Sequence, residues 1–407
     1  MSELFGVLRA PQTILFGAGQ RFALGQVATK IGRRAFICTD ERFAASNDMA
    51  ELLANLADAQ VEAQVFSETL AELPLHSVEA CVEKARSFNA DMVVGLGGGS
   101  CMDMAKLVSL LLKHGGPADR YYGELKVPGP IIPIIAIPTT SGTGSEVTPV
   151  AVLADHARDL KVGISSPYLI PHAAICDPEL TLSCPPKLTA LSGADALTHA
   201  VEAYTAIKQP RDRDLSQKRV FVGKNLFSDH QALTAIRLIA QYLPRAVKDG
   251  SDLEARSMLM YASTCAGLAF GAAGTAAAHA IQYPVGALTH TAHGLGVAAL
   301  MPYVMAFNAP SCSDELAEIG RAFGANGTAT ELGQQAIARI RALLADIGIP
   351  KTLADLGLTE DRLGWVAEQS MLSARLVNNN PRLLDVSAMT EIVTDAFYGR
   401  ERDLSLA

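Results

Sequence analysis

The segment VVGLGGGSCMDMAKLVSLL, residues 93–111, joins an apolar run to a helical pattern through a cluster of glycines. Short runs of β-branched and apolar residues, closed by polar residues, glycine or proline, are typical of strands buried on both faces of a sheet. Similar runs occupy residues 34–40, 61–67, 131–140 and 173–179. Helical patterns occupy residues 46–57, 76–88 and 101–114. Because strands and helices alternate, the sequence predicts a mostly parallel sheet covered by helices.

The second part of the chain has a different pattern. After DPELTLSCPPKL, residues 177–188, strand patterns stop and segments rich in alanine and leucine continue to the end. We expect helices there, with breaks near Pro210, Pro244, Gly250, Pro284, Pro310 and Pro350. A chain of 407 residues exceeds the size at which one hydrophobic core stops growing. The sequence therefore predicts an α/β domain over residues 1–184 and an all-helical domain over residues 185–407.

Composition and charge restrict the partners of the chain. Hydrophobic residues make up 49% of it and charged residues 19%, with a formal net charge of −8. A globular, mildly acidic chain without a basic tract is not expected to bind nucleic acid. The 7 cysteines form no C-x-x-C motif, which argues against a disulfide framework and against a thiolate zinc site. Because the N-terminus lacks a secretory signal pattern, we expect a cytoplasmic location.

One long segment carries no charge. Residues 257–289 contain no Lys, Arg, Asp or Glu and are long enough to span a bilayer. The segment consists largely of Ala, Gly, Ser and Thr, which gain little on transfer into lipid. A buried helix in the second domain is the preferred interpretation, and we expect no membrane partner.

The glycine cluster predicts an anion site. Gly97, Gly98, Gly99 and Ser100 separate the strand pattern from the helical pattern. Glycines let the backbone approach an anion closely, and the helix N-terminus supplies free N–H groups and a partial positive charge. This combination suits a pyrophosphate. The cluster is not the G-x-G-x-x-G fingerprint, and a plain tight turn is the alternative.

Two further segments suit a dinucleotide. Asp40 ends the run RAFICTD, where a carboxylate can bind the 2′-hydroxyl of an adenosine ribose and repel a 2′-phosphate, which favours NAD over NADP. The alternative role for Asp40 is a helix N-cap. The segment IPTTSGTGSEVTPVAVL, residues 137–153, carries hydroxyl groups that can wrap a ribose or phosphate, although such loops often bond their own backbone.

A metal site is indicated by two segments of the second domain. In SGADALTHAVEAYT, Asp195 and His199 are four residues apart, which places both on one helix face where a core would favour hydrocarbon. In AAAHAIQYPVGALTHTAHGLG, His279 and His293 are fourteen residues apart, and an intervening proline and glycine allow the chain to return to the same point. One carboxylate and three imidazoles suit Fe(II), Zn(II) or a similar ion. The alternative is a buried Asp–His hydrogen bond.

The motifs ILFGAG, GGGSCMDMAK, PTTSGTGSEVT, DPELT, SGADALTHAVEAY and HTAHGLGVAALMPYVMAFN resemble the iron-containing (group III) alcohol dehydrogenase family over nearly the whole chain. The resemblance implies a Rossmann-like NAD-binding α/β domain and an all-helical domain that binds metal and substrate, the dehydroquinate synthase-like fold. The implied metal ligands are Asp195, His199, His279 and His293. The implied cofactor contacts are Asp40, Gly97, Gly98, Gly99, Ser100, Asp103, Thr139, Thr140, Thr148, Lys161 and Leu180.

The chain departs from the family pattern at two places. Where the family often has a Pro-Asn-Pro-Thr turn on the adenosine side, this chain has ELPL at residues 72–75. Where many members have a histidine four residues after the third ligand, this chain has Tyr283, one helical turn after His279. Tyr283, with a reference pKa near ~10, and His290, with one near ~6.5, are the candidate proton-relay residues. Packing at the pocket wall is the alternative for Tyr283.

The resemblance implies reversible hydride transfer between NAD(H) and a small primary alcohol or its aldehyde, with a metal ion as Lewis acid. Fe(II) is expected, Zn(II) is the alternative, and a homodimer or larger homo-oligomer is implied. Three other functions stay open. The apparent insertion at residues 208–225 resembles the hydroxyacid-oxoacid transhydrogenases, which keep the nicotinamide bound. A dehydroquinate-synthase-like lyase would need basic residues that the metal-site segments lack, and a metal-binding protein without activity would leave the glycine cluster without a role.

Overall fold

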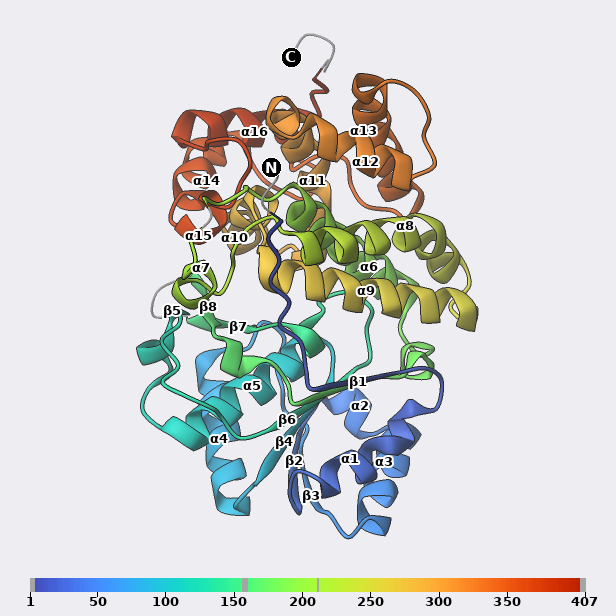
Figure 1. Ribbon diagram of the computed structural model, residues 1–407, viewed down its shortest axis with the longest axis vertical. Helices are drawn as coiled ribbons and strands as arrows, with labels where there is room; N and C mark the ends of the chain where they lie inside the picture. Colours follow the sequence, from blue (N-terminus) through green and yellow to red (C-terminus); the bar gives the residue numbers. More distant parts are fainter. Residues whose placement is uncertain (1–3, 156–159, 211, 403–407) are drawn as a thin grey trace. The chain divides into compact units, whose positions relative to one another are not determined.

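The computed structural model describes residues 4–155, 160–210 and 212–402, which fold into two compact units (Figure 1). The α/β unit comprises the described residues of 9–184 and 217–220. The helical unit comprises those of 1–8, 185–216 and 221–407. The main segments of the two units meet between Cys184 and Pro185. Two short segments therefore lie outside the unit in which the sequence places them, residues 4–8 and residues 217–220.

The α/β unit contains a six-stranded sheet in which every neighbouring pair is parallel, with strand order β1-β9-β6-β4-β2-β3. The strands are β1 (Thr13–Phe16), β2 (Arg34–Cys38), β3 (Glu62–Phe66), β4 (Met92–Gly97), β6 (Ile134–Pro138) and β9 (Ala173–Cys176). The α-helices of this unit are α1 (Leu24–Thr29), α2 (Glu41–Ala44), α3 (Asn47–Asp58), α4 (Leu75–Phe88) and α5 (Gly99–His114). The predicted α/β class is confirmed.

Successive residues of the strands pack on opposite faces of this sheet. Phe36 and Val93 belong to the apolar cluster that includes residues of α4 and α5. Their neighbours Ile37 and Val94 belong to the cluster that includes residues of α1 and α3. Successive residues of a strand point to opposite faces, so helices on both faces require the continuous apolar runs that the sequence contains.

A second sheet was not predicted from the sequence. It consists of β5 (Gly123–Glu124), β7 (Val150–Asp155) and β8 (Leu160–Ser165) in the order β5-β8-β7, with β7 antiparallel to β8. The end of the segment that was expected to be a loop, residues 137–153, is therefore a strand. Only alternate residues of β7 are buried, so β7 lacks the fully apolar run that marks the strands of the main sheet.

The order of the main sheet reverses between β2 and β4. From β2 the chain continues to β3 on one side, whereas from β4 it continues to β6 on the other side. The two strands pair directly, with Cys38 opposite Gly95. Ligands of open α/β sheets bind at such a reversal, beyond the carboxyl ends of the strands. Asp40 follows β2 and the glycine cluster follows β4, so both dinucleotide candidates stand at this edge.

The helical unit is built around a long buried helix, α6, which packs against α8, α9 and α11. Its helices are α6 (Pro186–Thr205), α8 (Leu226–Lys248), α9 (Leu253–Ala273), α10 (Ala277–Thr289), α11 (His293–Asn308), α12 (Ser313–Ala322), α13 (Ala329–Asp346), α14 (Leu363–Ser370), α15 (Ala374–Val377) and α16 (Val386–Tyr398). The short helix α7 (Leu215–Lys218) begins in this unit and ends in residues assigned to the α/β unit. The predicted helical class of the second part is confirmed.

Two of the expected helix breaks are wrong. Pro244 lies inside α8 and Pro284 inside α10. An interior proline costs a helix about 3 kcal/mol because it removes a hydrogen bond and crowds the preceding turn. Each helix buries one or more faces, with 7 of 23 residues of α8 and 8 of 13 residues of α10 buried, and we attribute their continuity to that packing. The other expected breaks lie outside the α-helices, near Pro210, Gly250, Pro310 and Pro350.

The uncharged segment at residues 257–289 forms two helices rather than one. It covers most of α9 and all of α10, which meet at an angle of 102°. Among the described helices, none is by itself long and apolar enough to cross a membrane. This bent pair has sufficient length and apolarity only when its two helices are taken together. Most residues of both helices are buried within the unit.

Candidate active site

The first two predicted metal ligands lie on α6. Asp195 and His199 are one helical turn apart on the same face, with 3.7 Å between Oδ1 of Asp195 and Nε2 of His199. Both side chains are buried, with exposed fractions of 6% and 7%. A proline occupies the first position of α6, where its missing N–H has no helical partner to lose.

The other two predicted ligands come from the first turn of α10 and the start of α11. His279 lies on α10 and His293 is the first residue of α11. Their Nε2 atoms are each 3.9 Å from Oδ1 of Asp195. The two helices approach closely because the side chain of Gln282 fits against Gly296, where a Cβ atom would lie 1.6 Å from Oε1 of Gln282.

Three imidazole nitrogens thus surround one carboxylate oxygen at 3.7–3.9 Å. These separations are too long for hydrogen bonds. They match a common ion, because two ligand atoms about 2.1 Å from one ion lie roughly 3–4 Å apart. The ligand atoms of Asp195, His199 and His279 lie within 4.8 Å of one another. The side chain of His293 is 33% exposed, which makes its side of the cluster the open one.

The electrostatics of the cluster favour a bound cation. Among the described residues, Oδ1 of Asp195 and Nε2 of His279 have no hydrogen-bond partner although both atoms are buried. Burial raises the pKa of Asp195 to about 7, with an opposing effect from His279 and a further raising effect from Glu202. A buried carboxylate without a compensating charge is costly. The donor set and its unpartnered atoms therefore fit a divalent metal ion.

A second carboxylate that sequence reasoning missed supports the cluster. Glu202 lies three residues after His199 on α6 and is buried. Its Oε2 lies 2.6 Å from Nδ1 of His279. The spacing Asp195, His199, Glu202 places three polar groups on one face of a helix, and this was the signal in the sequence that could have revealed it.

Aromatic rings line the cluster. The ring of Phe270 stacks on that of His199 with 4.2 Å between centroids. The ring of Tyr283 lies 6.3 Å from that of His293 at an interplanar angle of 25°. His290 is an exposed residue in the left-handed conformation that ends α10. Of the two relay candidates, Tyr283 is the one with a described contact to a predicted ligand.

The glycine cluster of the α/β unit forms a tight cradle at the start of α5. Gly97 has φ of 146°, and a Cβ atom there would lie 2.6 Å from Sγ of Cys101. At Gly99, a Cβ atom would lie 2.7 Å from Cγ2 of Thr143. Gly98 is the N-cap of α5 and provides no side-chain cap. The first N–H groups of the helix, which include that of Ser100, are suited to an anion because no helical carbonyl precedes them.

Asp40 fills one of the two roles that the sequence leaves open, that of a helix N-cap. Its Oδ1 accepts a hydrogen bond of 2.8 Å from the backbone N–H of Phe43, so Asp40 is the N-cap of α2. Its Oδ2 lies 3.7 Å from the position of a Cβ atom at Gly97. One oxygen thus caps a helix while the other faces the glycine cradle, where a ribose contact is geometrically compatible with the cap.

A fully buried lysine connects α5 to the loop that precedes β7. Nζ of Lys106 donates to Oγ of Ser145 at 2.9 Å and to the carbonyl and hydroxyl oxygens of Thr148 at 3.0 and 3.2 Å. Asp103 accepts from the hydroxyl of Ser145 and from the backbone N–H of Val152. Burial lowers the pKa of Lys106 to about 8, with opposing effects from Asp103 and Glu146. Asp103 and Thr148, both predicted cofactor contacts, therefore bond within the protein.

The remaining predicted cofactor contacts are distributed around this unit. The backbone N–H of Thr139 donates to the carbonyl of Gly97 at 2.9 Å. The hydroxyl of Thr140 lies 3.8 Å from the position of a Cβ atom at Gly98. Lys161 forms an ion pair of 2.8 Å with Glu72, in the ELPL turn. Leu180 is buried in the apolar cluster that includes residues of α1 and α3, so its side chain is part of the hydrophobic core.

Ion pairs join the two ends of segment 208–225 to α12 and α8. Lys208 lies 3.0 Å from Glu315, and Lys224 lies 2.9 Å from Asp229. Nζ of Lys224 also lies 3.7 Å from the ring centroid of Tyr204 on α6. Residue 211 lies outside the described residues.

Comparison with known proteins places both parts of the chain in one family. Residues 11–178 match the model of the iron-containing alcohol dehydrogenases, and residues 189–397 match the C-terminal model of the Fe-containing alcohol dehydrogenase family. Long-chain-alcohol dehydrogenase 1 of Geobacillus thermodenitrificans is 36% identical over 388 residues, which are 93% of this chain and 94% of that protein.

Solved structures agree with the sequence matches. A 1,3-propanediol oxidoreductase aligns with a TM-score of 0.90 and 32% identity over 97% of this chain and 100% of its own. The sulfoacetaldehyde reductase of Bifidobacterium kashiwanohense in complex with NAD⁺ aligns with a TM-score of 0.83 and 29% identity over 97% and 99%. The chain belongs to the iron-containing alcohol dehydrogenase family and is an oxidoreductase of alcohols and aldehydes.

Proposed function

We propose that this enzyme interconverts a small primary alcohol and its aldehyde with NAD(H), using a divalent ion held by Asp195, His199, His279 and His293. The observation that carries the proposal is the arrangement of three imidazole Nε2 atoms at 3.7–3.9 Å from one oxygen of Asp195. When bound, the ion supplies Lewis-acid stabilisation of the substrate oxygen, and the nicotinamide takes or returns the hydride.

The protein side chains provide the ligand set and its orientation. One carboxylate and three imidazoles suit Fe(II), and the same set accepts Zn(II). The stack of Phe270 on His199 holds that imidazole ring in place and keeps water from its face. The more exposed His293 leaves its side of the cluster accessible to a small substrate.

The cofactor is proposed to be NAD, bound at the edge where Asp40 and the glycine cradle stand. Two features support this choice. Oδ2 of Asp40 faces Gly97, where its charge would oppose the additional phosphate of NADP. The sulfoacetaldehyde reductase that aligns with this chain was solved with NAD⁺.

The alcohol proton needs a route to solvent, and Tyr283 and His290 are the two proposed relay residues. The ring contact between Tyr283 and His293 favours Tyr283 as the group beside the substrate. A phenol with a reference pKa near ~10 is a weak base at neutral pH, so its role would be to pass a proton along a hydrogen-bonded path. His290, an exposed imidazole at the end of α10, is the candidate to receive it at the surface.

Initial rates over a panel of alcohols and aldehydes test the proposal, with NAD(H) and NADP(H) in parallel and with metal-free, Fe(II)-loaded and Zn(II)-loaded enzyme. We expect NAD-linked turnover of a primary alcohol only with metal. Turnover of a hydroxy acid and an oxo acid without free NAD would instead select the transhydrogenase. The expected homo-oligomeric state stays a prediction, which light scattering after size-exclusion chromatography measures.

A further inference from the structure

We propose that Glu202 is a positioning residue of the metal centre, which fixes the tautomer of His279 and the start of α10 so that Nε2 of His279 is available to the ion. This inference rests on the proposed metal site. Glu202 contacts one proposed ligand, His279, through the ring nitrogen that faces away from Asp195.

Both oxygens of Glu202 are bonded to the beginning of α10. Oε2 lies 2.6 Å from Nδ1 of His279 and accepts from the backbone N–H of Ala276 at 2.8 Å. Oε1 accepts from the backbone N–H of Ala278 at 2.7 Å. Ala276 is the N-cap of α10 and has no side chain that could cap it. Glu202 therefore caps the start of α10 from another helix.

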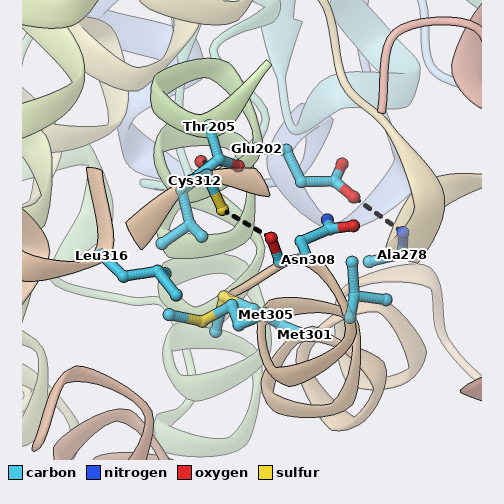
Figure 2. Close-up of a pocket in the computed structure, with 10 residues that line it drawn as sticks. Glu202, Thr205, Ala278, Met301, Met305, Asn308, Cys312 and Leu316 are labelled. Atoms are coloured by element: carbon cyan, nitrogen blue, oxygen red, sulfur yellow. Dashed lines mark hydrogen bonds between the residues drawn. The ribbon is translucent and has the colours of Figure 1, made fainter. Parts of the chain in front are cut away.

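The surroundings of Glu202 leave it few other partners. Figure 2 shows its carboxylate directed at the backbone of Ala278 beside a small pocket lined by Met301, Met305 and Leu316. The pocket has a volume of about 10 Å³, which is the space for one water molecule. Cys312, also at this pocket, donates to the carbonyl of Asn308. The described hydrogen-bond partners of the carboxylate all come from the start of α10.

The hydrogen bond determines which imidazole nitrogen can bind a metal. Both oxygens of Glu202 accept backbone N–H groups, so the atom that faces Nδ1 of His279 is an acceptor and Nδ1 carries the proton. Nε2 then has a free lone pair, and it is the atom that lies 3.9 Å from Oδ1 of Asp195 without a hydrogen-bond partner among the described residues. A carboxylate behind a ligating histidine raises its basicity and fixes its ring, and removing such a partner weakens metal binding roughly 10–100-fold.

The variant Glu202→Gln tests this role, because an amide keeps the size of the side chain and can donate to Nδ1, which would move the ring proton to Nε2. The matched control is Thr205→Val, which changes a buried group of α6 at the same pocket, whose hydroxyl donates to the carbonyl of Val201 in the same helix. The dissociation constants for Zn(II) and Co(II) are measured in full-length protein by competition with a chromogenic chelator. We expect Glu202→Gln to weaken binding roughly 10–100-fold and Thr205→Val to leave it within about twofold.

A second readout does not depend on metal binding. In metal-free protein labelled with ¹⁵N-histidine, long-range ¹H–¹⁵N spectra report which nitrogen of each ring is protonated, and His279→Gln assigns the signal. We expect Nδ1–H for His279 in the wild type and a loss of this pattern in Glu202→Gln. A purely structural role for Glu202 would lower thermal stability without changing the tautomer.

The outcomes separate this inference from the proposed function. Wild-type protein that binds metal tightly, with Glu202→Gln within about threefold of it, overturns the role of Glu202 and leaves the metal site standing. Wild-type protein that binds neither metal overturns both. If Glu202→Gln does not fold, the spectrum of the metal-free wild type decides, and a proton on Nε2 of His279 contradicts the inference.

Discussion

Oδ1 of Asp195 on α6 lies 3.9 Å from Nε2 of His279 on α10, and neither buried atom has a hydrogen-bond partner among the described residues. Two polar atoms held this way by separate helices are costly unless a third group joins them. Nε2 of His199 and Nε2 of His293 lie at similar distances from the same oxygen. A divalent ion at their centre would satisfy all four groups.

Removal of a buried ligand should affect metal content more than removal of the exposed one. We expect His279→Ala to lose most of the bound metal and His293→Ala to lose less, because their side chains are 5% and 33% exposed and water can replace the exposed imidazole more readily. Elemental analysis of purified protein measures the metal per chain. His230→Ala, a change at an exposed histidine of α8, is the control and should retain the wild-type content. Equal retention in all three variants would refute the assignment.

Chelation should abolish activity and lower thermal stability. A ligand that binds only the folded state stabilises it by about 2.7 kcal/mol at a concentration of 100 times its dissociation constant. We therefore expect the melting temperature of the chelated protein to fall and to recover on addition of Fe(II), together with the turnover of alcohol. Differential scanning calorimetry and initial rates on the same samples measure both effects. Full turnover in protein shown to be metal-free would contradict the proposed function.

Asp40 allows the cofactor preference to be tested apart from stability. Asn is as good an N-cap as Asp, so Asp40→Asn should retain the cap on α2 while removing the negative charge that faces Gly97. We expect the ratio of kcat/KM for NAD over NADP to fall, with a nearly unchanged melting temperature. Asp40→Ala should lower this ratio and also destabilise the protein by about 0.5–2 kcal/mol through the lost cap. Equal use of both cofactors by the wild type would count against the role of Asp40.

Lys106 should make stability depend on pH in the alkaline range. Burial lowers its pKa from 10.5 to about 8, so between these two values the unfolded chain binds the proton that the folded chain has released. The free energy of unfolding should then rise with pH across this window, by up to about 1.4 kcal/mol per pH unit relative to a variant without the group.

Urea unfolding of the wild type and of Lys106→Met at pH 8, 9 and 10 measures this difference. The variant should be less stable at every pH, because Asp103 and Thr148 lose a buried partner, but its free energy of unfolding should gain less between pH 8 and 10. Parallel pH dependences would show that Lys106 does not titrate differently in the folded state.

The relay residues can be ranked by kinetics. We expect Tyr283→Phe to lower kcat for alcohol oxidation more than His290→Ala does, because only Tyr283 has a described contact with a predicted ligand. His290→Ala should slow oxidation most at low pH, where proton acceptance limits the rate, without loss of metal. A pH–rate profile of His290→Ala that is identical to the wild type would remove His290 from the path.

Local patterns were sufficient for much of the architecture and for the first pair of proposed ligands to be noticed. The continuous apolar runs that form β2, β4 and β6 predict buried strands, because a strand covered by helices on both faces of its sheet has apolar residues on both sides. Asp195 and His199 stand out because their spacing alone places two polar groups on a buried helix face. Such features depend on residues close together in the sequence, and the sequence by itself determines them.

The tertiary structure decided what depends on distant partners. The short edge strand β1 exists through its pairing with β9, and Pro284 lies within α10 instead of breaking it. The spacing of Glu202 from Asp195 and His199 places it on the same face of α6, but only the approach of α10 brings its carboxylate to His279. Likewise, the sequence around Lys106 does not distinguish it from a surface lysine, and its burial follows from its contacts with Ser145 and Thr148 in the folded structure. The desolvation and hydrogen bonding that define these roles arise between segments far apart in the chain, and no local pattern contains them.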